Sequence, residues 1–414
     1  MIVRILIFVA ILLITEFLVL RTVLKTATEK KKKRKLAMYY LISTFLIILI
    51  TVIYYLYNQH TEAPDHEQFR RFFALSALLL LNIAPKIILS ILSTIDDIFR
   101  LIFIIIQYLL KTEMKALKIY TRRVLLLSGF FLALLLEGAL IYGIIQGKSE
   151  ITINRVNIYS PKLPKSFNGF KIAHISDFHL GSFKNTHLIE KAVILLQEEQ
   201  ADVVMFTGDM VNNEAVEVKP FIEIIKILKP PCGMFSILGN HDMGDYRRWY
   251  NEREKACNLK ELVRLQEEMG FTVLRNQHSY MVKGKDSIAV IGVDNWGEPP
   301  FKKYGDLNAA TEGLDTSTFS ILLSHDPSHW RNEVVSGTNI TLTLSGHTHG
   351  FQFAIKLGKY SFSPVQFKYK EWGGLYNEKE QYLYVNTGLG FIGFPGRIGV
   401  EPEITVITLN NDSN

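Results

Sequence analysis

The stretch that decides the fold of this chain is Ile175-Ser176-Asp177-Phe178-His179-Leu180-Gly181. It ends a hydrophobic run that starts at Phe170, and it places two side chains that can bind metal on alternate positions. In an extended chain, residues i and i+2 point the same way, so Asp177 and His179 can share one metal ion. A single Asp-x-His pair proves little. Its significance depends on polar residues that follow later apolar runs, at Asp209, Asn240, His325, His347 and His349.

Length and composition indicate more than one unit. At 414 residues the chain exceeds one ordinary domain. Long apolar runs fill residues 1–148, whereas the remainder has the mixed composition of a globular protein. Much of the net charge of +6 comes from one basic run, residues 30–35, so the charge does not predict nucleic-acid binding. Cys232 and Cys257 exclude a disulfide scaffold and a cysteine zinc site, while one bridge between them stays open.

Residues 1–148 are predicted to be an α-helical transmembrane region. Four apolar stretches are close to the roughly 20 residues that cross a bilayer, and they cover residues 2–24, 36–57, 72–95 and 124–146. A fifth stretch, 98–110, is too short to span, and its charged flanks favour an interfacial helix. Glu16 and Glu137 lie within spans. There they pair with a cation such as Arg21 or Lys86, sit near the end of a span, or serve a function.

The orientation follows from the lysine and arginine content of the short loops. Loop 26–35 is the most basic segment and is predicted to be cytoplasmic, whereas the acidic loop 58–71 is predicted to lie outside. Segment 96–123 is net basic again and is placed inside. We therefore expect an integral, multi-pass membrane protein whose fourth span delivers the chain from Lys148 onward to the extracytoplasmic side.

The remaining chain, residues 151–410, is expected to form one α/β domain. Apolar runs alternate with amphipathic stretches at first, and a strand-rich part then predicts a second sheet packed on the first. The predicted helices are 188–198, 220–228 and 259–269. The predicted strands are 171–176, 203–207, 233–238, 280–283, 287–293, 319–324, 341–345, 382–386 and 403–409.

Five of the predicted strands end at polar residues that can bind metal. In open α/β sheets, ligands bind beyond the carboxyl ends of the strands, so these residues are expected to converge on one site. Their donors are oxygen and imidazole nitrogen without sulfur, which suits Mn, Zn, Fe or Co. Seven donor residues exceed the needs of one ion. Two divalent ions about 3.5–4 Å apart, sharing a bridging carboxylate, fit the number better.

Taken together, these motifs resemble those of the calcineurin-like metallophosphoesterases. The resemblance covers residues 151–409 and rests on Asp177-Phe-His179, Gly208-Asp209, Gly239-Asn240-His241-Asp242, His325 and Gly346-His347-Thr348-His349. Segments 172–177 and 386–408 are similar to a membrane-associated bacterial phosphodiesterase branch of that superfamily. The fold it implies is two packed mixed sheets flanked by helices.

The resemblance also implies the role of each motif residue. One ion would be held by Asp177, His179 and His349. The other would be held by Asn240, His325 and His347, with Asp209 bridging the two. A hydroxide between the ions would attack phosphorus. His241 would bind the phosphate and protonate the leaving oxygen. The glycines Gly208, Gly239 and Gly346 would permit tight turns beside these ligands.

The chain departs from the family pattern at two positions. Asn212 stands where many relatives have a carboxylate that orients the motif histidine, which weakens the expected support for His241 as an acid. Phe351 stands where relatives often have a second glycine, which predicts a bulkier wall. Arg397, in a glycine-rich segment, is either a phosphate contact or part of a plain loop.

Two aromatic-rich segments, residues 245–249 and 296–304, are either a cap over the substrate or surface loops. His174 faces the opposite side of its strand from Asp177 and is expected to be structural.

The leading hypothesis is a membrane-anchored phosphoesterase that acts on a phosphodiester or a lipid-linked phosphate. The partners expected are membrane lipids and a phosphate-ester substrate, with no nucleic acid. One alternative is a pyrophosphohydrolase for a nucleotide-linked lipid, which requires a cytoplasmic site. The other is a membrane sensor whose metal domain binds a ligand without turnover.

Overall fold

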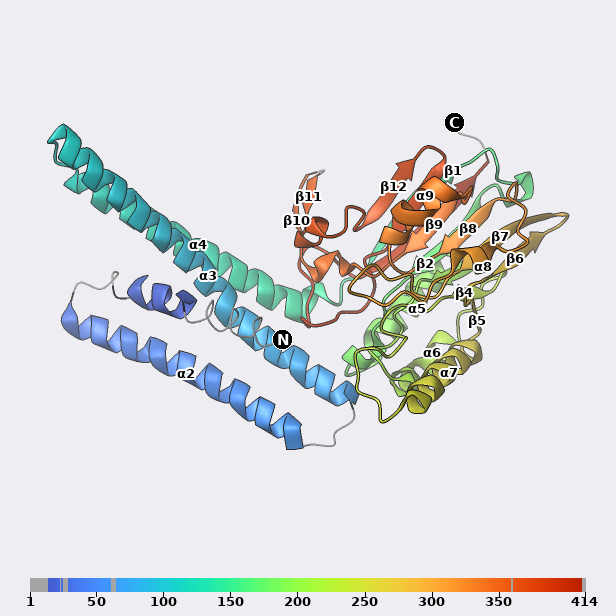
Figure 1. Cartoon of the computed structure of the whole chain (residues 1–414), viewed down its shortest axis with the longest axis horizontal. Helices are drawn as coiled ribbons and strands as arrows, with labels where there is room; N and C mark the ends of the chain where they lie inside the picture. The colour runs from blue at the N-terminus through green and yellow to red at the C-terminus, as the bar shows by residue number, and fades with distance from the viewer. Residues whose placement is uncertain (1–13, 23, 25–28, 61–64, 359, 412–414) are drawn as a thin grey trace. The chain divides into compact units, whose positions relative to one another are not determined.

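The computed structural model describes residues 14–22, 24, 29–60, 65–358 and 360–411. These residues form two compact units (Figure 1). The first unit lies within Met1–Glu62 and Ala74–Tyr142, and the second lies within Ala63–Phe73 and Gly143–Asn414.

The first unit is helical. Its main elements are α2 (Lys30–His60), α3 (Asp65–Leu110, whose first residues belong to the second unit) and α4 (Lys115–Tyr142). Within the described part of the chain, three helical stretches are long and apolar enough to cross a membrane: Lys30–Tyr54, His66–Leu110 and Lys115–Gly147. Most of the first predicted span, 2–24, lies outside the described residues, although residues 14–22 are helical.

Helix α3 is longer than the sequence suggests. A separate interfacial helix over 98–110 was expected, but α3 continues without a break through Asp96 and Asp97 to Leu110. Both carboxylates have basic partners. Asp96 accepts a hydrogen bond from Arg100 Nε at 3.1 Å, and Asp97 lies 2.7 Å from Arg21 Nη1. Because these charges are compensated, they do not end the helix. The prediction of a separate interfacial helix was wrong.

Glu16 lies in a polar cluster between helices of the first unit. Its carboxylate accepts hydrogen bonds from Lys86 Nζ at 2.8 Å and Thr44 Oγ1 at 3.0 Å, and from the hydroxyl of Tyr40. A paired carboxylate is the arrangement expected where burial makes a lone charge costly. The pairing of Glu16 with Lys86 is therefore confirmed.

The second unit contains two six-stranded mixed sheets. In the first sheet, β1 pairs in parallel with β14, β14 pairs antiparallel with β2, and β2 to β5 run parallel. In order across that sheet, the strands are β1 (Thr152–Tyr159), β14 (Glu403–Asn410), β2 (Phe170–Ile175), β3 (Val203–Phe206), β4 (Met234–Ser236) and β5 (Phe271–Val273). In the second sheet, the order is β12 (Gly374–Glu378), β13 (Gln381–Val385), β9 (Leu342–Ser345), β8 (Ser320–Leu323), β7 (Asp286–Gly292) and β6 (Gln277–Lys283).

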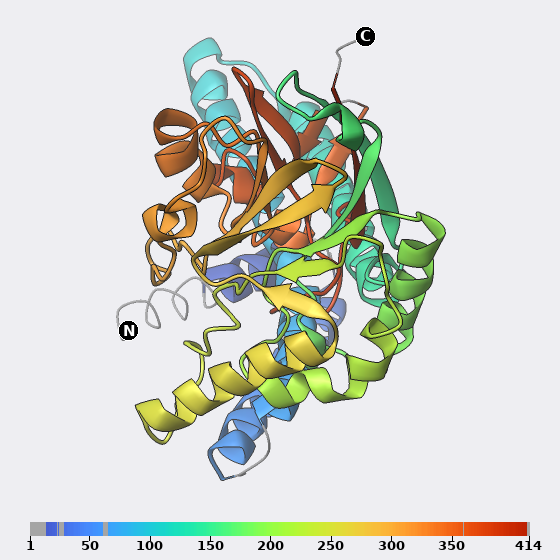
Figure 2. The same cartoon turned by 90° about the vertical axis from the view of Figure 1, so that its right-hand side faces the viewer.

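The two sheets pack face to face, with helices on their outer sides. Alternate residues of β2 show the division: Ile172 belongs to the core between the sheets, whereas Ala173 and Ile175 pack under helices. The helices α5 (His187–Glu198), α6 (Ile222–Ile225) and α7 (Glu252–Glu268) cover the first sheet (Figures 1 and 2). Helix α8 (Leu307–Thr311), the π-helix η5 (Trp330–Val334) and the short helix α9 (Val335–Gly337) follow strands of the second sheet.

Several elements were not predicted from the sequence. Strands β1, β5 and β12 were missed, as was a hairpin of β10 (Ile355–Leu357) and β11 (Tyr360–Phe362). Helix α7 begins well before residue 259, because Asn251 caps it by accepting a hydrogen bond from Glu254 N at 2.8 Å. Cys232 and Cys257 are free thiols, so the bridge that the sequence left open is not formed.

Short 3₁₀ helices and one π-helix, η1, connect the larger elements of the second unit. They are η1 (Gly143–Gly147), η2 (Lys165–Phe167), η3 (Leu180–Ser182), η4 (Ala215–Phe221), η6 (His349–Gln352) and η7 (Pro364–Phe367).

Candidate metal centre

The carboxyl ends of five strands from both sheets meet at one site. Strands β2, β3 and β4 of the first sheet are followed by Asp177 and His179, by Asp209 and by Asn240. Strands β8 and β9 of the second sheet are followed by the three remaining candidate ligands, His325, His347 and His349.

The backbone of this site is strained. Five of its candidate ligands have positive φ angles, a region that L-residues seldom adopt: Asp177 (53°), His179 (47°), Asp209 (59°), His347 (73°) and His349 (50°). Such a cluster of conformational outliers is typical of functional sites, where surrounding contacts hold the unfavourable backbone in place.

Two glycines allow the strand ends to approach one another. A Cβ at Gly239 would collide with the Asp209 carboxylate, and a Cβ at Gly346 would collide with that of Asp177. Both positions therefore require a residue without a Cβ.

The first group of potential ligands contains Asp177, His179 and His349. Their donor atoms lie within 4.8 Å of one another, and all three residues are buried. His349 Nε2 is 3.3 Å from Asp177 Oδ1 and 3.0 Å from His179 Nε2.

The second group contains Asp209, His325 and His347, again with donor atoms within 4.8 Å. His325 Nε2 lies 3.2 Å from Asp209 Oδ2, 3.3 Å from His347 Nδ1 and 3.1 Å from Asn240 Oδ1. The same Asp209 oxygen is 3.6 Å from His179 Nε2 of the first group. The Asp209 carboxylate therefore lies between the two groups.

These donor sets fit divalent ions. Metal–nitrogen bonds of about 2.1 Å put neighbouring ligands of one ion roughly 3.0–3.4 Å apart, and the closest donor pairs above lie in that range. Burial raises the pKa of Asp177, but the neighbouring His349 and His325 outweigh it and hold that pKa well below its usual range. Burial lowers the pKa of His347 to about 4. The Asp177 carboxylate is thus charged and the His347 imidazole neutral at pH 7. Burial also lowers the pKa of His325, but the neighbouring Asp209 carboxylate outweighs it and raises that pKa to about 10, so a metal ion that binds there must displace a proton.

Asp242 fixes the loops that carry two of the ligands. Its carboxylate accepts hydrogen bonds from the main-chain N–H groups of Asp209 (2.7 Å), Met210 (2.9 Å), Val211 (3.2 Å) and Gly239 (2.9 Å). One buried side chain therefore ties the loop after β3 to the loop after β4. The sequence contains this residue in a motif, but no role was predicted for it.

Asn212 acts differently from the sequence-based expectation. His241 Nδ1 lies 2.9 Å from the main-chain oxygen of Asn212, and the side-chain Oδ1 of Asn212 instead lies 3.1 Å from His179 Nδ1. The amide therefore orients a potential metal ligand, while His241 is oriented by a carbonyl that every residue type would supply. The concern that an amide weakens the support of His241 does not apply in this geometry.

Arg397 does not reach the cavity. Its guanidinium is buried and donates to the main-chain oxygens of Gly390 (2.9 Å from Nε), Thr387 (2.8 Å from Nη2) and Val400 (3.4 Å from Nη1). Nη2 also lies 3.2 Å from His349 Nδ1. The side chain fastens the glycine-rich loop behind a potential ligand, which argues against the phosphate contact considered from the sequence.

His174 is fully buried, and its Nε2 lies 2.9 Å from Thr207 Oγ1. It belongs to neither group of potential ligands, in agreement with the structural role expected for it.

A cavity of about 680 Å³ opens over both groups. His241, His347 and His349 are among the polar residues that line it. The rest of its wall is largely apolar and aromatic: Phe301, Phe351, Pro364, Val365, Phe367, Tyr369, Ile392 and Phe394. Phe351 thus forms part of a bulky wall, as its position in the motif predicted.

Each aromatic-rich segment sends one ring to the site. The Tyr246 ring packs on His241 at 4.4 Å between centroids, and its hydroxyl accepts a hydrogen bond from Asn240 Nδ2 at 2.9 Å. Phe301 packs edge-on against His347 at 4.8 Å.

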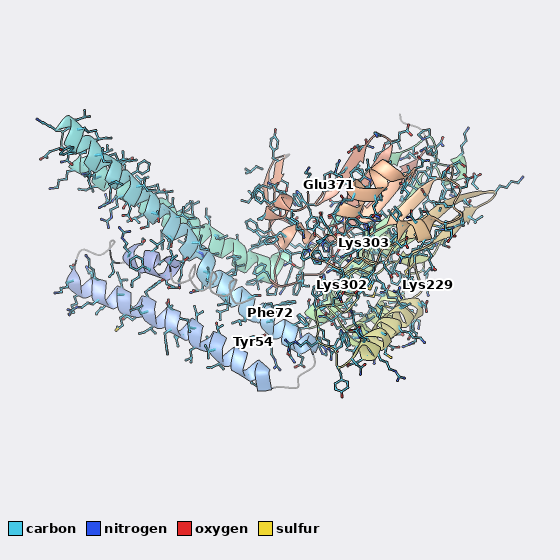
Figure 3. All side chains as sticks on the ribbon, viewed as in Figure 1. Tyr54, Phe72, Lys229, Lys302, Lys303 and Glu371 are labelled. Atoms are coloured by element: carbon cyan, nitrogen blue, oxygen red, sulfur yellow. The ribbon has the colours of Figure 1, made fainter. Side chains whose placement is uncertain are left out.

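Asp245 joins the two segments. It accepts hydrogen bonds from Lys302 Nζ at 2.7 Å and from the Tyr304 hydroxyl at 2.8 Å (Lys302 is labelled in Figure 3).

Tyr369 was missed entirely in the sequence. Its hydroxyl lies 2.8 Å from His347 Nε2. It follows no strand end and belongs to no motif, so no local signal marked it.

Two packed mixed sheets with carboxylate and imidazole ligands at their strand ends define the metallophosphoesterase class, and comparison with known proteins agrees. The "Calcineurin-like phosphoesterase" family matches residues 170–351. A second family, "Probable Calcineurin-like phosphoesterase, transmembrane domain", matches residues 3–148. The chain belongs to the calcineurin-like phosphoesterase family, whose members are phosphoester hydrolases that use divalent metals, and it carries that family's transmembrane domain.

Three relatives illustrate the similarity. The uncharacterized metallophosphoesterase YkuE of Bacillus subtilis is 32% identical over 61% of this chain and 84% of its own length. The "Transmembrane protein with metallophosphoesterase domain" of Danio rerio is 29% identical over 68% of this chain, and the match spans only 64% of that relative. An uncharacterized metallophosphoesterase of Aquifex aeolicus is 26% identical over 64% of this chain and 94% of its own length.

Proposed function

We propose that this protein is a membrane-anchored phosphodiesterase that uses two divalent ions. The observation that carries the proposal is the shared carboxylate: one Asp209 oxygen lies 3.2 Å from His325 Nε2 and 3.6 Å from His179 Nε2, which belong to different groups of ligands. When bound, the two ions supply an activated water and positive charge for the phosphoryl oxygens. The hydroxide between them remains a prediction.

The residues of the chain position the substrate and a proton. His241 lines the cavity beside both groups, and the main-chain oxygen of Asn212 holds its Nδ1. Because this carbonyl can only accept, Nδ1 carries the proton of the neutral ring, and Nε2 can protonate the leaving oxygen only after it has itself taken up a proton. Tyr246 packs against this ring and prevents it from turning away from the cavity.

The charges of the cavity favour a diester over a monoester. Among the described residues that line it, Lys368 is the one lysine or arginine, and Arg397 is committed to main-chain oxygens. A diester carries one negative charge. A monoester dianion carries a second negative charge, which the residues that line the cavity do not neutralise. The volume also leaves room for a group on each side of the phosphorus.

Hydrolysis by the full-length protein in nanodiscs tests this proposal. After chelation and reloading with Mn²⁺ or Zn²⁺, we expect turnover of an aryl phosphodiester to exceed that of the matched aryl phosphomonoester. Asp209→Asn should abolish both activities, because it removes the charge shared by the two groups. Full activity in that variant would disprove the bridge.

We further propose that the site lies outside the cytoplasm and acts on a lipid-linked ester. The proposal is supported by the basic segments 26–35 and 96–123 and by the short connection between the last span and β1. A reporter that is active only in the cytoplasm, fused after Asn414, should be silent. An active reporter would favour the cytoplasmic lipid pyrophosphohydrolase instead.

A further inference from the structure

The hairpin of β10 and β11 carries an exposed apolar surface. It belongs to neither six-stranded sheet, and Figure 1 shows it as a separate pair of strands. In its antiparallel register, Ile355 faces Phe362 and Leu357 faces Tyr360. Cross-strand partners share a face, as do residues i and i+2. All four apolar side chains therefore point to one side.

This hairpin is amphipathic, yet its apolar face is not buried. Leu357 is 72% exposed and Ile355 is 50% exposed. Lys356 and Ser361 occupy the opposite face, where Lys356 Nζ donates to Glu401 Oε2 at 2.8 Å. Lys356 and Ser361 are exposed as well, so neither face of the hairpin is buried and its apolar side chains have no core to cover them. An exposed apolar patch of this kind marks a site of interaction.

The apolar surface continues into the cavity of the metal centre. Phe362 of β11 packs edge-on against Phe367 at 6.1 Å, and Phe367, which is 82% exposed, lines the cavity. Phe351, also exposed, lines the same wall two residues after His349. Ser363 Oγ donates to Gly350 O at 2.8 Å and so ties the end of the hairpin to the ligand motif. We call the apolar residues of this surface the apolar rim: Phe351, Ile355, Leu357, Tyr360, Phe362 and Phe367.

The chain indicates what covers the apolar rim. The candidate span Lys115–Gly147 ends in the π-helix η1, and Arg397 N donates to Gly143 O of that helix at 3.2 Å. The next residue, Ile398, accepts a hydrogen bond from Ala354 N at 2.8 Å, directly before β10. Two consecutive hydrogen-bonded contacts within the second unit thus connect the end of the span to the base of the hairpin. The base of the hairpin therefore lies close to the point at which the chain of the second unit leaves the membrane span.

We infer that the apolar rim inserts into the surface of the lipid bilayer and lets a lipid phosphate ester enter the cavity with its acyl chains still in the membrane. The route runs from Leu357 at the hairpin tip, along Phe362 and Phe367, to the metal centre. The catalytic half of this inference rests on the proposed function. The insertion of the hairpin does not.

Insertion is measured without catalysis. A nitroxide is attached to Leu357→Cys in the full-length protein in nanodiscs, with Cys232 and Cys257 replaced by serine. The matched control is Val282→Cys on β6, a residue 67% exposed. We expect the label at 357 to be relaxed more by oxygen than by a water-soluble nickel chelate, and the label at 282 to show the reverse. Equal exposure to the chelate at both positions would overturn the inference.

Substrate entry is measured with two matched double variants. Ile355→Glu/Leu357→Glu charges the hairpin, and Tyr280→Glu/Val282→Glu charges two exposed apolar residues with the same spacing on β6. We expect the first variant alone to hydrolyse a phospholipid in the nanodisc on the order of tenfold more slowly, because apolar insertion is lost. Its turnover of a soluble aryl diester should stay within about twofold, since these side chains lie outside the cavity.

The possible results separate the two claims. Equal loss with both substrates, or no loss with either, contradicts entry through the apolar rim. Absence of any hydrolysis by the unmodified protein contradicts the proposed function, whereas the nitroxide measurement still decides insertion. Disulfide-linked dimers of the unlabelled Leu357→Cys protein would show that a second copy covers the surface, and would also refute docking on lipid.

Discussion

Replacing Asn212 with alanine separates two roles that meet at one residue. The variant removes the side-chain oxygen 3.1 Å from His179 Nδ1 but leaves the main-chain oxygen 2.9 Å from His241 Nδ1. We therefore expect Asn212→Ala to weaken metal binding while sparing the proton donor. A carboxylate variant, Asn212→Asp, should keep the contact with His179 and bind metal at least as well as the original protein.

The size of the effect follows from the contact that is lost. A hydrogen bond to the outer nitrogen of a metal-bound histidine fixes the ring and its tautomer, and its removal costs about 10–100-fold in metal affinity. This corresponds to about 1.4–2.7 kcal/mol. At saturating metal, kcat should recover to within a few-fold, because His241 keeps its partner.

The assay is a metal titration of chelator-treated protein that records both bound metal and aryl diester hydrolysis. Asn213→Ala is the matched control. Asn213 is equally buried, and its side-chain amide has no hydrogen-bond partner among the residues that the structure describes. That variant loses the same volume without losing the contact, so its titration curve should stay close to that of the original protein.

One result would refute this reasoning. If Asn212→Ala bound metal normally but lost kcat even at saturating metal, the side chain would be acting on His241, as a simple reading of the sequence suggests.

Three further predictions concern metal, ring packing and pH. Removal of the metals by chelation should lower the melting temperature, and Mn²⁺ should restore it, since an ion at 1,000 times its Kd adds about 4 kcal/mol to the free energy of unfolding. Tyr246→Phe should weaken binding of the metal at Asn240 yet keep kcat at saturating metal. Tyr246→Ala should also lower kcat, because the ring that packs against His241 is lost. Equal kcat values in the two variants would contradict this prediction. Burial lowers the pKa of His174 from 6.5 to about 4. The unfolded chain therefore binds the extra proton first, and the free energy of unfolding should fall by about 3 kcal/mol as pH drops from 6.5 to 4. In thermal unfolding, His174→Gln should make the free energy of unfolding depend less on pH. An unchanged pH dependence would show that other groups cause it.

Local patterns in the sequence predicted much of the fold. Strands β3 and β8 are buried along their whole length, and β2 is buried except at Lys171. Their mostly apolar sequences were therefore recognisable without tertiary information. Strand β1 was missed because most of its residues are exposed or half-buried, and its pairing with β14 comes from the opposite end of the chain. Strand β5 has only three residues, which is too short for a periodic signal. Helix α3 was divided at two aspartates whose basic partners the sequence alone does not reveal.

The sequence by itself determined the candidate ligands, because a polar residue at the end of an apolar run is a local pattern. Tertiary structure alone decided how those ligands are supported. The side chain of Asn212 points toward His179 and not toward His241. This depends on the left-handed backbone at His179 and on the way the loops after different strands are brought together. The same holds for Arg397, which is buried among main-chain oxygens, and for Tyr369, which meets His347 from outside every motif. Contacts between distant segments are fixed by packing, and a short motif such as Asp177-Phe178-His179 does not encode them.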